Sequence, residues 1–238
     1  MTTNKVQSLA AAMEQRILTA QWVPGSKLPG QAQLMAEFGV ARTTLREALG
    51  LLQSRGVLLT QHGSGSYVNN LFEESFLPPL NLLSMTDPQA QVAVLEMRQV
   101  LEGEAAFYAC QRASEVELAA IDAEYQRMLL RADKMPVLER AKADLTFHML
   151  IAEASHNLWV VSLSQLLYSK MFNTIFAALS GGMLEQAGNM EAVDRQHCDI
   201  YTALLRRDAV AARLAAQVHA RHTALMRQQQ RQDSEDSL

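Results

Sequence analysis

The sequence predicts a mainly α-helical protein: an N-terminal winged helix-turn-helix of three helices and a β-hairpin, then an all-α bundle of about six helices. Apolar residues recur at helical spacing along most of the chain, and β-prone residues gather only near residues 57–68. Residues 1–70 carry six basic and three acidic side chains, whereas the remainder carries 15 basic and 22 acidic ones. A basic head on an acidic body favours a polyanionic partner for the head.

The head contains three helical patterns in succession. The first carries apolar residues at helical spacing over 6–17 and must stop before Pro24. The second is short and ends at Gly39, a residue suited to a left-handed helix exit. The third spans residues 42–55 and crowds short polar and basic side chains into its first turn. Three helices joined by short turns are typical of a helix-turn-helix unit.

After the third helix the period of the pattern changes. Residues 57–60 and 67–68 are β-prone, and the loop between them, 61–66, is rich in glycine and serine. This order predicts a β-hairpin, the wing of a winged helix-turn-helix. We therefore place a DNA-binding domain at residues 1–70.

An irregular stretch with Pro78 and Pro79 predicts a linker at residues 71–88. No strand is expected beyond it, so residues 89–230 are predicted to form an all-α domain. Ser114 and Glu117 form a capping box inside this domain. Its helices are expected at 89–112, from 114 onward, from Pro136 to His156, and at 158–179, 190–206 and 209–230. Residues 231–238 are predicted to be a disordered tail.

Composition narrows the location of the protein. No apolar stretch reaches the roughly 18 residues that a membrane span needs, and the N-terminus lacks a continuous apolar segment. The lack of a long apolar stretch predicts that the protein does not contact a membrane. The two cysteines are too few for a disulfide framework, so we expect buried thiols and a reducing compartment. The expected location is the cytoplasm.

The residues KLPGQAQLMAEFGVARTTLREALGLLQSRGVLLTQHGSGSYV resemble the DNA-binding domain of the GntR superfamily of bacterial transcription regulators. The body, with EMRQVLEGEAA, ADLTFHMLIAEASHN and RQHCDIYTALLRRD, resembles the FCD ligand-binding domain of the FadR-type subfamily. Its linker and first body helix look most like regulators of lactate, pyruvate and glycolate use. The resemblance implies an operator-binding regulator that responds to a small molecule.

Two positions depart from the family pattern. The chain has Gly30, Gln31 and Ala32 where relatives have Ser-Glu-Arg, so an arginine that relatives use on DNA is absent. Ala41 replaces the serine that caps the third helix in relatives, and alanine at an N-cap costs about 1 kcal/mol relative to serine. Both departures bear on DNA affinity.

DNA contacts are expected from the front of the third helix, because that end of a recognition helix enters the major groove. The wing tip is expected to approach the minor groove or the backbone, and a plain hairpin turn is the alternative. The predicted DNA-binding residues are Arg42, Thr43, Thr44, Arg46, His62 and Gly63.

A metal site is expected in the body. Asp144 and His148 lie at i and i+4 on one helix, and two antiparallel helices bring His197 and His219 nearly level. The resemblance assigns these four residues as ligands, which suits Zn²⁺, Ni²⁺ or Mn²⁺. His222 is a competing ligand, and satisfied core or surface histidines are the alternative to any site.

Open positions on such a metal invite a small carboxylate, a 2-hydroxy or 2-oxo acid, whose other end Arg98 could hold. Asn173 is a further effector-binding candidate. The alternative for Arg98 is an ordinary surface bridge to Glu102 one turn away.

These residues predict a ligand-responsive transcription regulator, a repressor that binds a palindromic double-stranded DNA operator as a homodimer. Two other functions remain open: a metal-dependent enzyme with an Asp/His₃ centre, and a regulator that senses the metal itself. We expect no enzymatic activity, because no general base is identifiable beside the ligands.

Overall fold

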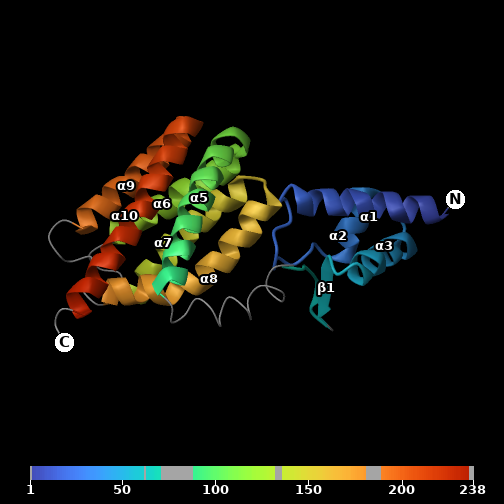
Figure 1. Cartoon of the computed structure of the whole chain (residues 1–238). Helices are drawn as coiled ribbons and strands as arrows, with labels where there is room; N and C mark the ends of the chain where they lie inside the picture. The colour runs from blue at the N-terminus through green and yellow to red at the C-terminus, as the bar shows by residue number, and fades with distance from the viewer. Residues whose placement is uncertain (1, 62, 71–87, 132–135, 181–188, 236–238) are drawn as a thin grey trace.

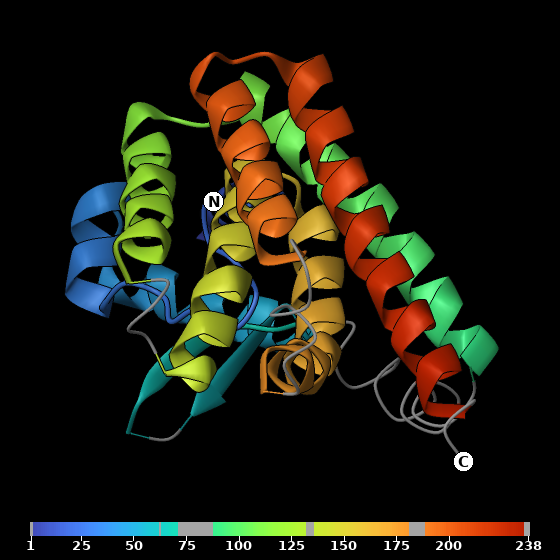
Figure 2. The same cartoon turned by 90° about the vertical axis from the view of Figure 1, so that its left-hand side faces the viewer.

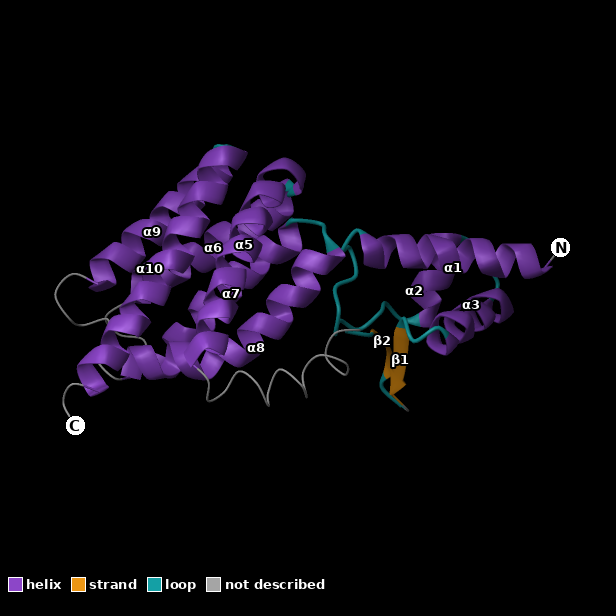
Figure 3. Ribbon diagram, viewed as in Figure 1, coloured by secondary structure: helices purple, strands orange, loops and turns teal. Residues whose placement is uncertain are grey.

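The structure is a computed structural model that describes residues 2–61, 63–70, 88–131, 136–180 and 189–235. Within these ranges it contains nine helices and one two-stranded sheet (Figure 3). The predicted mainly α class, with a winged helix-turn-helix followed by a helical bundle, is confirmed. The winged part lies at one end of the molecule and the bundle at the other (Figure 1).

The winged part consists of α1 (Thr2–Leu18), α2 (Gln31–Phe38), α3 (Arg42–Ser54), β1 (Leu58–Gln61) and β2 (Gly65–Val68). The two strands pair antiparallel. Apolar side chains from all five elements form one core, so the hairpin is held against the helices by hydrophobic burial. This packing fixes the direction in which α3 projects.

Six helices form the bundle. Its main core draws small and large apolar side chains from all of them, so each helix is positioned by its neighbours. Figure 2 shows α5 and α10 side by side along one edge of the bundle, which agrees with their extensive contact. The helices are α5 (Pro88–Arg112), α6 (Glu115–Arg131), α7 (Val137–Ala154), α8 (Leu158–Ser180), α9 (Asn189–Leu205) and α10 (Ala209–Glu235).

Local signals in the sequence account for several helix ends. In the predicted capping box, the backbone N–H of Ser114 donates to the Glu117 carboxylate at 2.8 Å, and the N–H of Glu117 donates to Ser114 Oγ at 3.3 Å. The expected disorder of the tail from residue 231 is wrong as far as Glu235, because α10 continues to that residue. Glutamine and arginine are good helix formers, and no proline or glycine interrupts them.

Two further expectations concern single residues and the membrane. Cys110 is buried as expected, whereas Cys198 is exposed, because it lies on the solvent side of α9. No helix in the described ranges is long and apolar enough to cross a membrane.

The winged part touches the bundle at the turn between α7 and α8. The ring of His156 lies 3.1 Å from the carbonyl oxygen of Thr19 and 3.0 Å from the Glu117 carboxylate, so it bridges the two parts. On α8, the amide of Gln165 donates to the carbonyl oxygen of Pro24 at 3.0 Å. Leu158 packs against the core of the winged part. These contacts connect α7 and α8 directly to the winged part.

Candidate DNA-binding surface and metal centre

The first turn of α3 presents short polar and basic side chains to solvent. Arg42, Thr43 and Arg46 are exposed, and Thr44 is half-buried. Leu45 points the other way and is fully buried in the core, so the helix is anchored on one face and open on the other. Such a face suits entry into a major groove, where arginine can bind guanine edges through two hydrogen bonds.

Ion pairs in the winged part leave the basic residues of this face available. Arg55 pairs with Glu14 at 2.6 Å, and Arg16 pairs with Glu37. Arg42 and Arg46 form no ion pair with any residue that the structure describes. Glu14 and Glu37 are thus neutralised by arginines that lie away from the front of α3. The positive charges of Arg42 and Arg46 at the front of α3 are not neutralised by these two carboxylates.

The wing tip is partly described. Gly63 is exposed and has a φ of 75°, a left-handed conformation that glycine adopts without strain. His62 lies outside the described residues, so its predicted contact stays a prediction. Lys27, which sequence reasoning missed, lies beside the wing, where its Cε would be 3.1 Å from a Cβ placed on Gly65. The sequence feature that could have indicated Lys27 is the extended segment before α2, in which it lies.

The two departures from the family pattern have visible consequences. Ala41 occupies the N-cap of α3 and provides no side-chain hydrogen bond. Gly30 occupies the N-cap of α2, also without a side-chain hydrogen bond. The N-terminal backbone N–H groups of both helices therefore lack the side-chain acceptor that serine would supply.

The four predicted metal ligands converge inside the bundle. Asp144 and His148 come from α7, His197 from α9 and His219 from α10. One ligand atom from each lies within 4.8 Å of all the others. His197 Nε2 is 3.3 Å from both His148 Nε2 and Asp144 Oδ1. The four residues that the resemblance to the FCD domain assigned are thus brought together by the packing of three helices.

The surroundings favour neutral imidazoles at His148 and His219 and an ionised carboxylate at Asp144. Burial lowers the pKa of His148, and burial together with His197 and His148 lowers the pKa of His219 well below its usual value. Burial opposes ionisation of Asp144, but a hydrogen bond from His197 and the nearby positive charges hold the pKa of this carboxyl below its usual value. Neutral histidine and ionised aspartate are the forms that bind a metal.

A buried ion pair adjoins the cluster. Arg98 Nε donates to Glu102 at 2.5 Å, so the pair considered as an alternative exists, but both side chains are only 3% exposed. A surface bridge is therefore wrong, because α5 turns these residues inward. Arg98 also donates to Thr223 Oγ1 at 2.9 Å and lies 3.3 Å from His219 Nε2.

Sequence reasoning missed two residues here, Glu102 as a partner of the cluster and Tyr168. The free carboxylate oxygen of Glu102 lies 3.7 Å from His148 Nδ1, and the Tyr168 hydroxyl donates to the other oxygen at 3.1 Å. A carboxylate that faces the second nitrogen of a histidine orients that ring as a metal ligand. The sequence signal available for Glu102 was its i,i+4 relation to Arg98.

The donor set fits a divalent metal ion. His219 Nδ1 and one Glu102 oxygen are buried with no hydrogen-bond partner among the described residues, which is costly unless something binds there. One carboxylate and three imidazoles are ligands that Zn²⁺, Ni²⁺ and Mn²⁺ accept. Asp144, His148, His197 and His219 would hold such an ion.

Two other histidines lie apart from the cluster. His222, the competing ligand, has its Nδ1 3.2 Å from Gln196 Oε1. His156 bridges the two parts of the chain. Neither belongs to the group of ligand atoms that converge.

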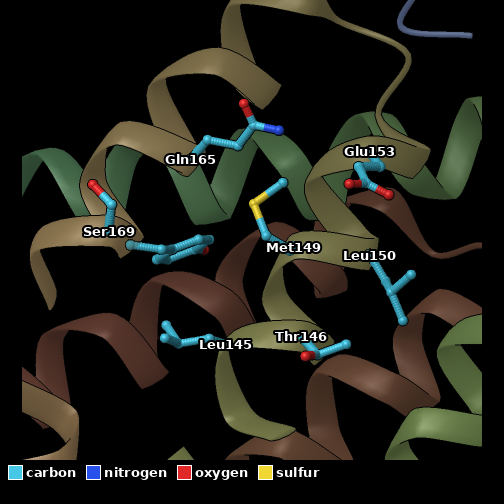
Figure 4. Close-up of a pocket in the computed structure, with 8 residues that line it drawn as sticks. Leu145, Thr146, Met149, Leu150, Glu153, Gln165 and Ser169 are labelled. Atoms are coloured by element: carbon cyan, nitrogen blue, oxygen red, sulfur yellow. The ribbon is translucent and has the colours of Figure 1, made fainter. Parts of the chain in front are cut away.

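A pocket of about 380 Å³ lies beside the cluster, between α7 and α8. Figure 4 shows Met149 at its centre, between Leu145 and Gln165. Tyr168 also lines it, and the hydroxyl of this residue reaches Glu102, so one side chain borders both the pocket and the buried ion pair. Asn173 lies on α8, but its side chain is outside the described part and its role stays a prediction.

The histidine pKa values predict a pH-dependent stability of the metal-free protein. The pKa of His148 and His219 is lowered in the fold, so the unfolded chain takes up protons first as pH falls through about 6.5, the usual histidine value. We expect the thermal midpoint of chelator-treated protein to drop by several degrees between pH 7.5 and 5.5. The drop should shrink in His219→Gln, and an equal drop in this variant would contradict the assignment.

The fold and the site together define a class. A winged helix-turn-helix with an exposed basic recognition helix, joined to a helical domain with a buried ligand cluster, defines a DNA-binding transcription regulator with a sensory domain. The chain matches the bacterial regulatory proteins of the gntR family over residues 5–68 and the FCD domain over residues 93–222. It therefore belongs to the GntR family, as a member with an FCD domain, and is a regulator rather than an enzyme.

Curated relatives are similar along most of the chain. The Glc operon transcriptional activator of Escherichia coli (strain K12) is 32% identical over 216 residues, which cover 90% of this chain and 85% of that protein. A protein of the same strain assigned to regulation of the L-lactate dehydrogenase operon is 30% identical and covers 85% of this chain and 79% of its own. A solved structure, Streptococcus agalactiae GntR, shares the fold with a TM-score of 0.52 at 22% identity, over 92% of this chain and 98% of that one.

Proposed function

We propose that this regulator binds its operator as a homodimer, that it acts as a repressor in the cytoplasm, and that a small carboxylate bound at a metal centre in the FCD domain changes its operator affinity. The observation that carries the proposal is the cluster of Asp144, His148, His197 and His219 beside Arg98, inside a member of a DNA-binding family. The metal is proposed to be Zn²⁺, Ni²⁺ or Mn²⁺.

The chemistry of the site favours a compact anion. A divalent ion held by these four ligands would supply Lewis acidity to a bound acid. Arg98 adds a buried positive charge 3.3 Å from His219, so carboxylate and hydroxyl or keto oxygens would meet positive charge on two sides. A 2-hydroxy or 2-oxo acid presents such oxygens next to each other, whereas a long acyl chain gains little in this polar surrounding.

The name of one relative, which contains L-lactate, supports the same class of ligand. Two of the relatives carry the names of the Glc operon and the L-lactate dehydrogenase operon. We extend to this chain only the chemical class, a small hydroxy or oxo acid. Asn173 remains a proposed contact to such an acid.

The structure offers a direct route from the site to the winged part. Asp144 and His148 lie on α7, and the turn after α7 holds His156 against Thr19 of the winged part. A ligand shifts operator affinity only if it binds the two arrangements of the winged parts unequally. Movement of α7 on ligand binding would alter this contact and hence the spacing of the two recognition helices.

A dimer on a palindromic operator explains how one winged part per chain reads an extended site, since two half-sites follow the twofold symmetry of the protein. Repression is proposed as the simplest effect of operator binding on transcription. A dimer that covers two turns of DNA prevents other proteins from binding the same stretch of DNA. Lys27 and Gly63 are positioned to add backbone contacts at the wing.

The proposal predicts that ligand and operator binding are coupled. Calorimetric titration of the metal-loaded full-length protein with lactate, glycolate, pyruvate and a long-chain control acid should give heat of binding for a small acid only. Operator affinity, measured by fluorescence anisotropy, should change about 5–150-fold when that acid saturates the protein. Arg98→Lys keeps the positive charge but loses the planar guanidinium, which can bind a carboxylate through two hydrogen bonds. This variant should therefore bind the acid more weakly.

Two outcomes would contradict this proposal. Binding of an acid with equal affinity in the presence and absence of operator would remove the coupling. A change of operator affinity with metal alone, together with indifference to every acid, would instead establish a metal sensor.

A further inference from the structure

The hydrogen bonds of the Glu102 carboxylate are unevenly divided between its two oxygens. One oxygen accepts from Arg98 Nε at 2.5 Å and from the Tyr168 hydroxyl at 3.1 Å. The other oxygen lies 3.7 Å from His148 Nδ1 and is buried without a hydrogen-bond partner among the described residues. Because a buried acceptor without a donor is costly, the carboxylate has a second favourable orientation in which this oxygen turns toward His148.

A bound acid would compete with Glu102 for the guanidinium of Arg98. This guanidinium donates to Glu102 and to Thr223, and its Nη2 lies 3.3 Å from His219 Nε2, so one nitrogen faces the metal cluster. A carboxylate that binds Arg98 from the side of the cluster places a second negative charge close to Glu102. Like charges repel strongly in a buried site, because little water screens them. The expected response is a rotation of the Glu102 carboxylate away from Arg98.

Tyr168 connects the Glu102 carboxylate to α8. Its hydroxyl donates to the same oxygen that Arg98 holds, and the whole residue is only 5% exposed. Its ring centroid lies 6.2 Å from that of His148, so the ring is placed between the metal cluster and the backbone of α8. A displacement of the Glu102 oxygen therefore acts on α8 through this hydrogen bond.

Gln165, about one turn earlier on α8, holds the winged part with both halves of its amide. Its Nε2 donates to the carbonyl oxygen of Pro24 at 3.0 Å, and its Oε1 accepts from Asn70 Nδ2 at 3.3 Å. Residues 165 and 168 are separated by about 4.5 Å along the helix axis, at 1.5 Å per residue. A shift of α8 at Tyr168 is therefore also a shift at Gln165.

The contact with Gln165 lies where several segments of the winged part meet. The backbone N–H of Gly25 donates to the carbonyl oxygen of Val68 at 2.8 Å, which joins the segment after α1 to the end of β2. The side chain of Asn69 donates to the carbonyl oxygen of Gly56 at 2.9 Å, and Gly56 lies just after the end of α3. The segments that Gln165 holds are thus tied to the recognition helix.

We propose that α8 couples the acid site to the recognition helix: Tyr168 follows the Glu102 carboxylate, and Gln165 passes the displacement of α8 to the winged part. The inference rests on the proposed function and adds a second helix to the route through α7. Tyr168 and Gln165 act through Glu102 and the winged part, so both are positioning residues. Acid binding thereby changes the hold of Gln165 and the orientation of α3.

The test uses full-length, Zn²⁺-loaded protein and compares operator affinity with and without saturating L-lactate, glycolate or pyruvate. The ratio of the two operator dissociation constants, measured by fluorescence anisotropy, should be about 5–150 in wild type. Tyr168→Phe removes the hydroxyl and keeps the ring. Gln165→Met keeps the length of the side chain and loses both hydrogen bonds. Each variant should lower the ratio to about 2 or less, while calorimetry still detects acid binding.

Ser169→Ala is the matched control. Ser169 lies on the same helix and lines the same pocket, but its hydroxyl donates to the carbonyl oxygen of Leu166 within α8. This variant should keep the wild-type ratio. The Tyr168→Phe/Gln165→Met double variant should behave like either single variant, because substitutions along one connected route are not additive.

Hydrogen exchange of the metal-free protein gives a second measurement that needs neither acid nor metal. Peptides that contain Gly25 should exchange faster in Gln165→Met than in wild type, because the winged part loses two hydrogen bonds to α8. Equal exchange in the two proteins would contradict the hold of Gln165 on the winged part.

The outcomes separate this inference from the proposed function. A wild type whose operator affinity responds to none of the three acids overturns both. A responsive wild type with equally responsive Tyr168→Phe and Gln165→Met variants overturns the route through α8 and leaves the proposed function standing. Loss of acid binding in Tyr168→Phe would make Tyr168 a contact of the acid and overturn its positioning role. Circular dichroism and bound metal should match wild type in every variant.

Discussion

Purified full-length protein with His148→Ala or His197→Ala is expected to lose its divalent metal. Each ring is 3% exposed and has its Nε2 within 3.3 Å of the other, so each provides one of four converging ligands. Removing one ligand from such a set leaves water in its place and strongly lowers the affinity for the metal. Metal analysis after dialysis should give about one ion per wild-type chain and far less for either variant.

The controls for this prediction lie in the same domain. His222→Ala removes the histidine on α10 that contacts Gln196 and should leave metal content unchanged. Glu102→Gln should weaken metal binding about 10–100-fold while the ligands stay intact, because the carboxylate orients His148. Stoichiometric metal in the His148→Ala/His197→Ala double variant would refute the site.

The second large effect is expected at the recognition helix. Arg42→Ala and Arg46→Ala should each weaken specific operator binding by about 10–100-fold, the equivalent of about 1–3 kcal/mol for a lost base contact. Both side chains are exposed on the first turn of α3, so the fold should be unaffected. Anisotropy titrations with operator DNA and with a scrambled duplex measure the loss of specificity.

Arg55→Ala is the matched control, because it removes the same charge from the same domain. Arg55 lies at the end of α3 and pairs with Glu14, away from the first turn, so its loss should change operator affinity much less. Wild-type binding should also weaken steeply with salt, since phosphate contacts release counterions. Equal affinity for operator in wild type and both recognition-helix variants would contradict the assigned face.

The winged helix-turn-helix followed very closely from the sequence. Helical periodicity, the change to a short β-prone pattern and the glycine-rich loop are local signals, and they specified elements whose ends the structure moves by only a few residues. The capping box of Ser114 and Glu117 is local in the same sense, and its hydrogen bonds form as expected. The tail was less predictable, because helix propensity and a polar composition point in opposite directions there.

The sequence by itself determined the class of fold and the DNA-binding head, because both depend on local period and motif, and its resemblance to the FCD domain assigned the four candidate ligands. Only the tertiary structure decided that Arg98 and Glu102 form a buried pair at the cluster and that His156 bridges to the winged part. These features depend on the side of each helix that packing buries, and an amphipathic pattern cannot specify which neighbour covers which side when both sides carry apolar residues.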